Sequence, residues 1–160
     1  ALKAVDAILA KVSGDHEALK LRGDLLAAGN KFDDAVAAYR KAVEAKPDYL
    51  VARVAMLNIL LSQSRLDEAA KELEPVRKQA PNSPSTRYFE TQLAYQKKDF
   101  KAAKDSVLQL LKIAPDHPQA LLLAGAIELQ VGTTLQGSAR RGRRRGASAK
   151  SGARRRIGGA

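Results

Sequence analysis

Two Asp–His pairs are the first residues of this chain whose types could do chemistry. His16 follows Asp15 and His117 follows Asp116, and a carboxylate beside an imidazole can orient a catalytic histidine. Neither histidine has a second one at the spacing of a zinc site. Each pair stands before an apolar, helix-like stretch, so we interpret both as N-terminal helix caps. The sequence therefore predicts no catalytic or metal-binding role for either histidine.

Two acidic pairs, Asp33-Asp34 and Asp67-Glu68, are the other candidates for chemistry, because neighbouring carboxylates can divide the roles of general acid and general base. The pairs lie 34 residues apart, so we interpret them as charges in the first turn of a repeated helix, where the helix dipole favours anions. The chain has no Cys and no glycine-rich phosphate loop. These features argue against an enzyme and against a bound cofactor or metal.

A 34-residue period organises the helices that carry these residues. It appears in four series that share one register: Pro47, Pro81, Pro115; Ala35, Ala69, Ala103; Tyr39, Leu73, Val107; and Ala42, Val76, Leu110. Within each copy, apolar residues recur at three- and four-residue steps, which is typical of helices with one buried stripe. Helices of three or four turns are marginal alone, so these must stack. The sequence predicts an all-α solenoid of helix pairs.

The copy at residues 19–47 resembles the tetratricopeptide repeat (TPR), a 34-residue helix–turn–helix unit. Seven residues carry the resemblance: Leu19, Gly23, Leu26, Ala35, Tyr39, Ala42 and Pro47. The resemblance implies a right-handed α-solenoid. Arg53 and Arg87 stand where the pattern usually has a large apolar residue, and Leu57 and Thr91 stand where it usually has glycine. We therefore expect packing within the second and third repeats to differ in detail.

The repeat register divides residues 1–131 into a solenoid of five parts. These are the second helix of a preceding repeat (1–15), three full repeats (16–49, 50–83 and 84–117) and the first helix of a truncated repeat (118–131). We expect the chain to be one piece of a longer array. The helix at 118–131 has apolar residues on two faces and no partner helix, so we expect exposed apolar surface and self-association there.

Two segments, residues 80–100 and 114–130, are similar to repeat-rich lipoproteins found with bacterial PEP-CTERM/exosortase systems. Those proteins are associated with exopolysaccharide export and lie at the cell envelope. The resemblance implies an envelope or periplasmic location, whereas a scaffold outside that group would be cytoplasmic. The Cys that carries the lipid in such proteins is absent here. The sequence leaves the compartment open.

Binding is the function that a solenoid without catalytic residues suggests, because stacked repeats present an extended concave surface. The TPR resemblance places the first helix of each pair along this surface. We expect a partner-binding groove formed by ten residues: Lys20, Asp24, Val51, Val54, Asn58, Leu61, Tyr88, Gln92, Tyr95 and Leu122. The tyrosines supply contact area with a polar tip, and the amides suit a peptide backbone. The aliphatic members have a second interpretation, which is packing against the neighbouring repeat.

The groove residues argue against one specific ligand, an acidic C-terminal tail. TPR proteins that bind the acidic C-terminal tails of chaperones use a clamp of Lys, Asn, Asn, Lys and Arg at set positions. Here Lys20 fits the first position, but Asp24, Ala55, Ser85 and Phe89 fill the others. The expected partner is therefore a protein or peptide that is not held by a C-terminal carboxylate.

The last segment, residues 132–160, is a different kind of sequence. It holds eight Arg, one Lys and no acid, whereas residues 1–131 hold 19 basic and 17 acidic residues, and the whole chain carries +11. The repeat pattern stops there, because Arg141 and Arg144 occupy its main packing positions. Three interpretations compete: a basic arm for nucleic acid or anionic membrane, a disordered linker, or an out-of-frame, non-native reading. The abrupt loss of the repeat favours the third.

Overall fold

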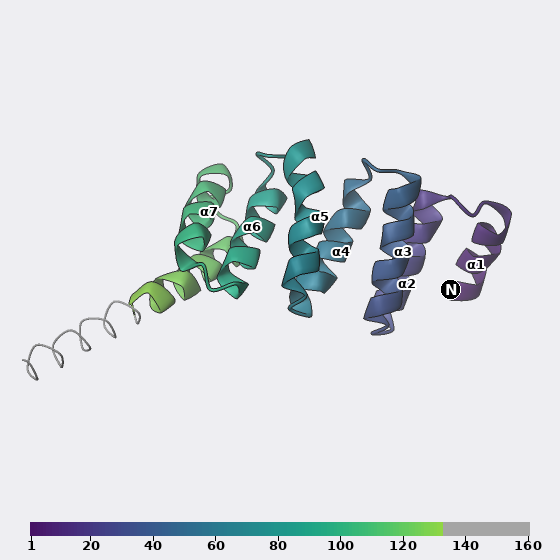
Figure 1. Cartoon of the computed structure of the whole chain (residues 1–160), viewed down its shortest axis with the longest axis horizontal. Coiled ribbons are helices and arrows are strands. Elements are labelled where there is room, and N and C mark those ends of the chain that lie inside the picture. Colours follow the sequence, from purple (N-terminus) through teal and green to yellow (C-terminus); the bar gives the residue numbers. More distant parts are fainter. Residues whose placement is uncertain (133–160) are drawn as a thin grey trace, which may run out of the picture.

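The fold is a row of stacked α-helices (Figure 1). A computed structural model describes residues 1–132, and no strand occurs among them. Seven helices are α1 (Leu2–Lys11), α2 (His16–Ala28), α3 (Phe32–Ala45), α4 (Leu50–Ser62), α5 (Leu66–Gln79), α6 (Pro84–Gln96) and α7 (Phe100–Ile113). A further helix occupies residues 118–132. The predicted all-α solenoid is confirmed, and the proposals made for residues 133–160 lie outside the described part.

The turns inside the helix pairs use one backbone device. Asn30, Ser64 and Lys98 have φ of 58°, 56° and 62°, and they lie 34 residues apart. A residue in this left-handed conformation terminates a helix. Asn adopts the conformation more readily than Ser or Lys. The second and third turns are therefore imposed by the packing of the helices that they join.

The residues singled out for possible chemistry serve as helix caps and first-turn charges. Asp15 caps α2 by accepting from the backbone N–H groups of Glu17 (3.0 Å) and Ala18 (3.1 Å). At the second Asp–His pair the histidine is the cap, because Nδ1 of His117 accepts from the N–H of Ala120 at 3.3 Å. The acidic pairs lie in the first turns of α3 and α5, as predicted.

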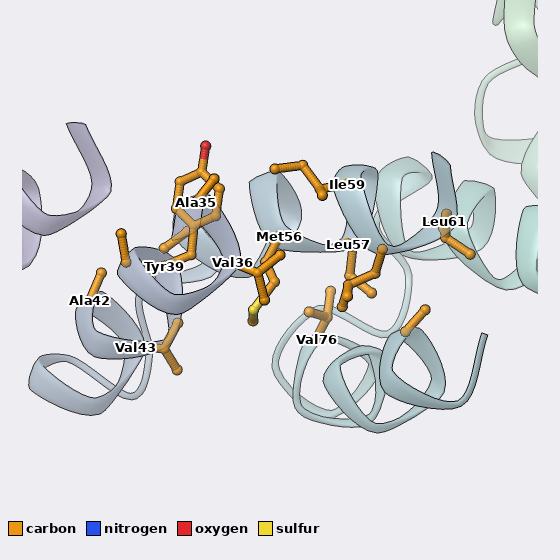
Figure 2. Close-up of a cluster of buried hydrophobic side chains, with 14 of the residues drawn as sticks. Ala35, Val36, Tyr39, Ala42, Val43, Met56, Leu57, Ile59, Leu61 and Val76 are labelled. Atoms are coloured by element: carbon orange, nitrogen blue, oxygen red, sulfur yellow. The ribbon is translucent and has the colours of Figure 1, made fainter. Parts of the chain in front are cut away.

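Close approach of α2 and α3 depends on Gly23. A Cβ atom at this position would lie 2.5 Å from Cε1 of Tyr39, so only glycine leaves room for the ring. Figure 2 shows Tyr39 on α3 between the small residues Ala35 and Ala42. The Tyr39 hydroxyl donates to Oδ1 of Asp24 at 2.8 Å, and burial together with this bond raises the pKa of Tyr39 above its usual range.

The core consists of two clusters rather than one. The larger runs from Leu19 to Phe89 and the smaller from Ala103 to Ile127, while Tyr88 packs against both. The two arginines that replace apolar residues of the repeat pattern pair differently: Arg53 of α4 reaches a carboxylate of α5, whereas Arg87 pairs within α6. Nη1 of Arg53 donates to Glu72 at 3.0 Å, and Nη1 of Arg87 donates to Glu90 at 2.9 Å.

Candidate functional site

A small pocket opens between α6 and the helix at 118–132. It measures about 290 Å³ and is lined by Tyr88, Gln92, Gln119, Leu122, Leu123 and Ala126. We call it the Tyr88 pocket. Three of the predicted groove residues, Tyr88, Gln92 and Leu122, meet there, and Leu122 is 77% exposed. The pocket therefore combines an aromatic ring, aliphatic side chains and two amides.

The ring of Tyr88 is held in place by its neighbours. It stacks on the imidazole of His117, with ring centroids 5.6 Å apart and planes inclined by 24°. Phe89 contacts it from the same helix at 5.8 Å. His117 thus caps the last helix and supports the pocket ring, a second role that the sequence analysis did not assign. The sequence feature that could have indicated this role is that His117 directly precedes the helix at 118–132, which lines the same pocket.

Tyr95 lies in a separate pocket. This space of about 260 Å³ is lined by Tyr95, Gln96, Lys98, Phe100 and Gln130. The rings of Tyr95 and Phe100 meet edge to face at 5.8 Å. The two tyrosines are seven residues apart, which is about 10 Å along a helix, so they line different recesses of α6.

The remaining groove residues on α4 differ in exposure. Val51 and Asn58 are exposed, and Val54 is half-buried against the larger core cluster. The prediction for Leu61 is wrong. Its side chain is 2% exposed and belongs to the core beside Leu57 (Figure 2), because its side of α4 faces a neighbouring helix.

Lys20 and Asp24 form an ion pair at one end of the array. Nζ of Lys20 lies 2.7 Å from Oδ2 of Asp24, whose other oxygen accepts from Tyr39. Both residues are partly exposed. The two charges neutralise each other. Asp24 also holds the hydroxyl of Tyr39, which lies in the core between α2 and α3.

A polar cleft between α5, α6 and α7 was not anticipated. It measures about 370 Å³, and the carboxylate of Glu90 at its wall accepts from Arg77 (2.6 Å) and Arg87 (2.9 Å). The hydrogen bond to Glu90 raises the pKa of Arg77. Ser106 stands 34 residues after Glu72, so the third repeat lacks the carboxylate that Arg53 uses. This replacement was the signal in the sequence. Both arginines of the cleft, Arg77 and Arg87, form ion pairs with Glu90.

Residues 1–132 contain neither a cluster of metal ligands nor a membrane-spanning helix. No group of three or more His, Asp or Glu side chains in residues 1–132 is placed to hold a metal ion. Within the same residues, no helix is long and apolar enough to cross a membrane.

Fold and pocket together define an α-solenoid that presents an extended surface. The sequence model of the tetratricopeptide repeat matches residues 25–93. Cellulose synthase operon protein C of Pseudomonas fluorescens (strain SBW25) is 35% identical over 100 residues. That alignment covers 58% of this chain but only 8% of the relative, so the chain spans a small part of the relative's length.

Two solved structures show the same fold. MamA (residues 41 to the end) from Desulfovibrio magneticus RS-1 superposes with a TM-score of 0.75 at 18% identity, covering 82% of this chain and 74% of MamA. YrrB, described as a TPR protein with an unusual peptide-binding site, gives 0.68 at 17% identity, covering 83% of this chain and 69% of YrrB. The fold is that of a TPR solenoid.

Proposed function

We propose that this chain is part of a TPR-family scaffold that binds a peptide segment of a partner protein on the face formed by α4, α6 and residues 118–132. We call this surface the groove face. The observation that carries the proposal is the Tyr88 pocket, where a supported aromatic ring, an exposed leucine and two amides converge. Tyrosines packed in the centre of a binding surface often carry much of the binding energy at protein interfaces.

The energetics of the pocket favour a side chain over water. Burying apolar surface contributes about 25 cal/mol per Å². Leu122 is largely exposed, so a partner side chain seated in the pocket would remove its apolar surface from water. Because His117 already supports the Tyr88 ring, little side-chain freedom remains to be lost on binding.

We further propose that the scaffold serves a bacterial exopolysaccharide export system at the cell envelope. Two similarities support this placement. The curated relative carries the name of a cellulose synthase operon protein, and residues 80–100 and 114–130 are similar to lipoproteins of PEP-CTERM/exosortase systems. This placement is separate from the groove itself and does not affect the binding test below.

A matched pair of variants tests the groove. A phage-displayed library of random peptides is selected on the full chain, and bound phage are compared on Leu122→Ser and Leu121→Ser. Both leucines are exposed neighbours on one helix, but only Leu122 lines the pocket. We expect binding to fall at least about tenfold on Leu122→Ser and to persist on Leu121→Ser. Equal binding to both variants, or no enrichment, would contradict the proposal.

A second candidate function is electrostatic binding to nucleic acid or anionic membrane through the basic tail. The observation behind it is the run of eight Arg and one Lys without an acid in residues 132–160. Such binding weakens steeply with salt, with a log–log slope of about 0.9 per phosphate contacted. Titrating duplex DNA and phosphatidylserine vesicles at several salt concentrations, with and without residues 133–160, separates this function from groove binding.

A further inference from the structure

Formal charges are sparse on the helices that build the groove face. α4 carries only Arg53, α6 carries Arg87 and Glu90, and residues 118–132 carry Glu128. The second helices α5 and α7 are rich in charge by comparison. From α4 onward, charge is therefore concentrated on the second helices of the pairs, whereas the first helix α2 of the preceding repeat is charged.

Each of the four charges is engaged in an ion pair, and three of the pairs reach a second helix. The pairs are Arg53 with Glu72 of α5 (3.0 Å), Glu90 with Arg77 of α5 (2.6 Å), Glu128 with Lys104 of α7 (2.7 Å), and Arg87 with Glu90 (2.9 Å). None of these side chains lines the Tyr88 pocket. The pairs direct charge toward α5 and α7 and leave the groove face without an unpaired formal charge among the residues described.

The polar groups that do line this face are amides. Gln92 and Gln119 border the Tyr88 pocket, and Asn58 lies exposed on α4, which packs beside α6. An amide side chain both donates and accepts hydrogen bonds, as does a peptide backbone. Asn58 and Gln92 occupy the same repeat position on neighbouring helices. Packed helices lie about 8–10 Å apart, a distance that three residues of extended chain span.

We infer that the groove face takes an uncharged, extended internal segment of a partner protein, with a large apolar side chain seated in the Tyr88 pocket. This rests on the proposed function and deepens it. A charged segment would lose hydration in the groove and find no opposite charge there, so it would bind more weakly. A helical segment already pairs its backbone N–H and C=O groups internally, so the amide side chains of the groove face would have no backbone group to bind.

The test uses the peptides selected on the full chain after removal of those that also bind Leu122→Ser. The removal step discards peptides held by residues 133–160, because that variant carries the same tail. We expect the surviving peptides to contain Leu, Met or Phe and to be depleted of Asp, Glu, Lys and Arg. Their dissociation constants, measured by fluorescence anisotropy, should change less than about twofold between low and high salt, because little charge is involved.

A charge-insertion variant sharpens the test. Gln92→Lys should raise the dissociation constants of the uncharged peptides at least about tenfold, since it puts an unpaired ammonium beside the pocket. Gln109→Lys adds the same charge on α7, outside the Tyr88 pocket, and should leave their affinity unchanged. Selected peptides that are charged, or an affinity that falls steeply with salt, would overturn this inference while leaving a peptide-binding groove intact. Absence of any Leu122-dependent peptide would instead overturn the proposed function.

Discussion

The first complete helix pair and the last described helix carry the same two residues in different surroundings. Leu19 and Gly23 on α2 correspond to Leu121 and Gly125, three repeat lengths later. Leu19 is 6% exposed and Leu121 is 52% exposed. A Cβ at Gly23 would strike the Tyr39 ring, whereas a Cβ at Gly125 would meet no atom of residues 1–132 within 4 Å. A repeat sequence therefore specifies a helix locally, and burial comes from the next helix in the stack.

The largest expected effect comes from removing the ring that covers α2. Tyr39→Ala should lower the free energy of unfolding by about 3–5 kcal/mol, because it empties a buried aromatic site beside Gly23. Tyr39→Phe keeps the ring and loses only the hydroxyl bond to Asp24, so it should cost about 1 kcal/mol. Urea unfolding followed by circular dichroism measures both. Similar costs for the two variants would show that the ring does not hold this pair together.

The two equivalent glycines should respond to alanine with opposite signs. Gly23→Ala overpacks the Tyr39 contact and should destabilise the fold by about 1–3 kcal/mol. Gly125→Ala meets open space and should stabilise the last helix by up to about 1 kcal/mol through helix propensity alone. Thermal unfolding of the two variants side by side checks the comparison, and a shared sign would break it.

Leu121, one of the exposed leucines of the helix at 118–132, should promote self-association. Burying a leucine side chain is worth about 1.5–3 kcal/mol, so Leu121→Ser should raise the dissociation constant of a self-associated species about tenfold or more. Sedimentation velocity over a range of protein concentrations measures this constant. Gln109→Ser, a change at an exposed position on α7, is the control that should leave it unchanged. A wild-type chain that stays monomeric throughout the range would refute the prediction.

The smallest expected effect concerns an ion pair between the first two repeats. Glu68 of α5 accepts from Arg65 and from Arg40 of α3, and these bonds lower its pKa from 4.5 to about 2. The ionised carboxylate therefore stabilises the fold above its ordinary pKa, and this contribution is lost as the pH falls from 4.5 toward 2. Because the pair is well exposed, the effect should be small and weaker in salt.

Glu68→Gln tests this contribution directly. The variant should be less stable than the wild type near neutral pH, and the difference should shrink as the pH falls through that window. Urea midpoints measured at several pH values and two salt concentrations give the comparison. A difference between the two proteins that stays constant with pH would show that Glu68 acts through packing rather than through its charge.

The sequence predicted the fold class because a 34-residue period constrains every helix at once. It also predicted Tyr88, Gln92 and Leu122 as groove residues, and they line one pocket. The prediction failed at Leu61, because an aliphatic residue on a first helix has the same pattern whether it faces a groove or a neighbouring helix. Only the placement of the adjacent repeat decides between the two.

Two further features depend on distances between repeats that no local pattern encodes. The stacking of His117 on Tyr88 joins residues 29 positions apart, across the whole of α7. In the polar cleft Glu90 pairs with both Arg77 and Arg87, and Ser106 stands where the preceding repeat has the carboxylate of Glu72. In both cases the residue types were visible, but their meeting in space was not.

The most direct test of the central account is the location of the bound peptide. Backbone amide NMR shifts of the full chain, titrated with a selected uncharged peptide, locate it residue by residue. The account predicts the largest shifts around Tyr88, Gln92 and Gln119 and at Asn58 on α4, with little change on α3, α5 and α7. Shifts concentrated on those second helices or on residues 133–160 would contradict a charge-free groove face as the binding surface.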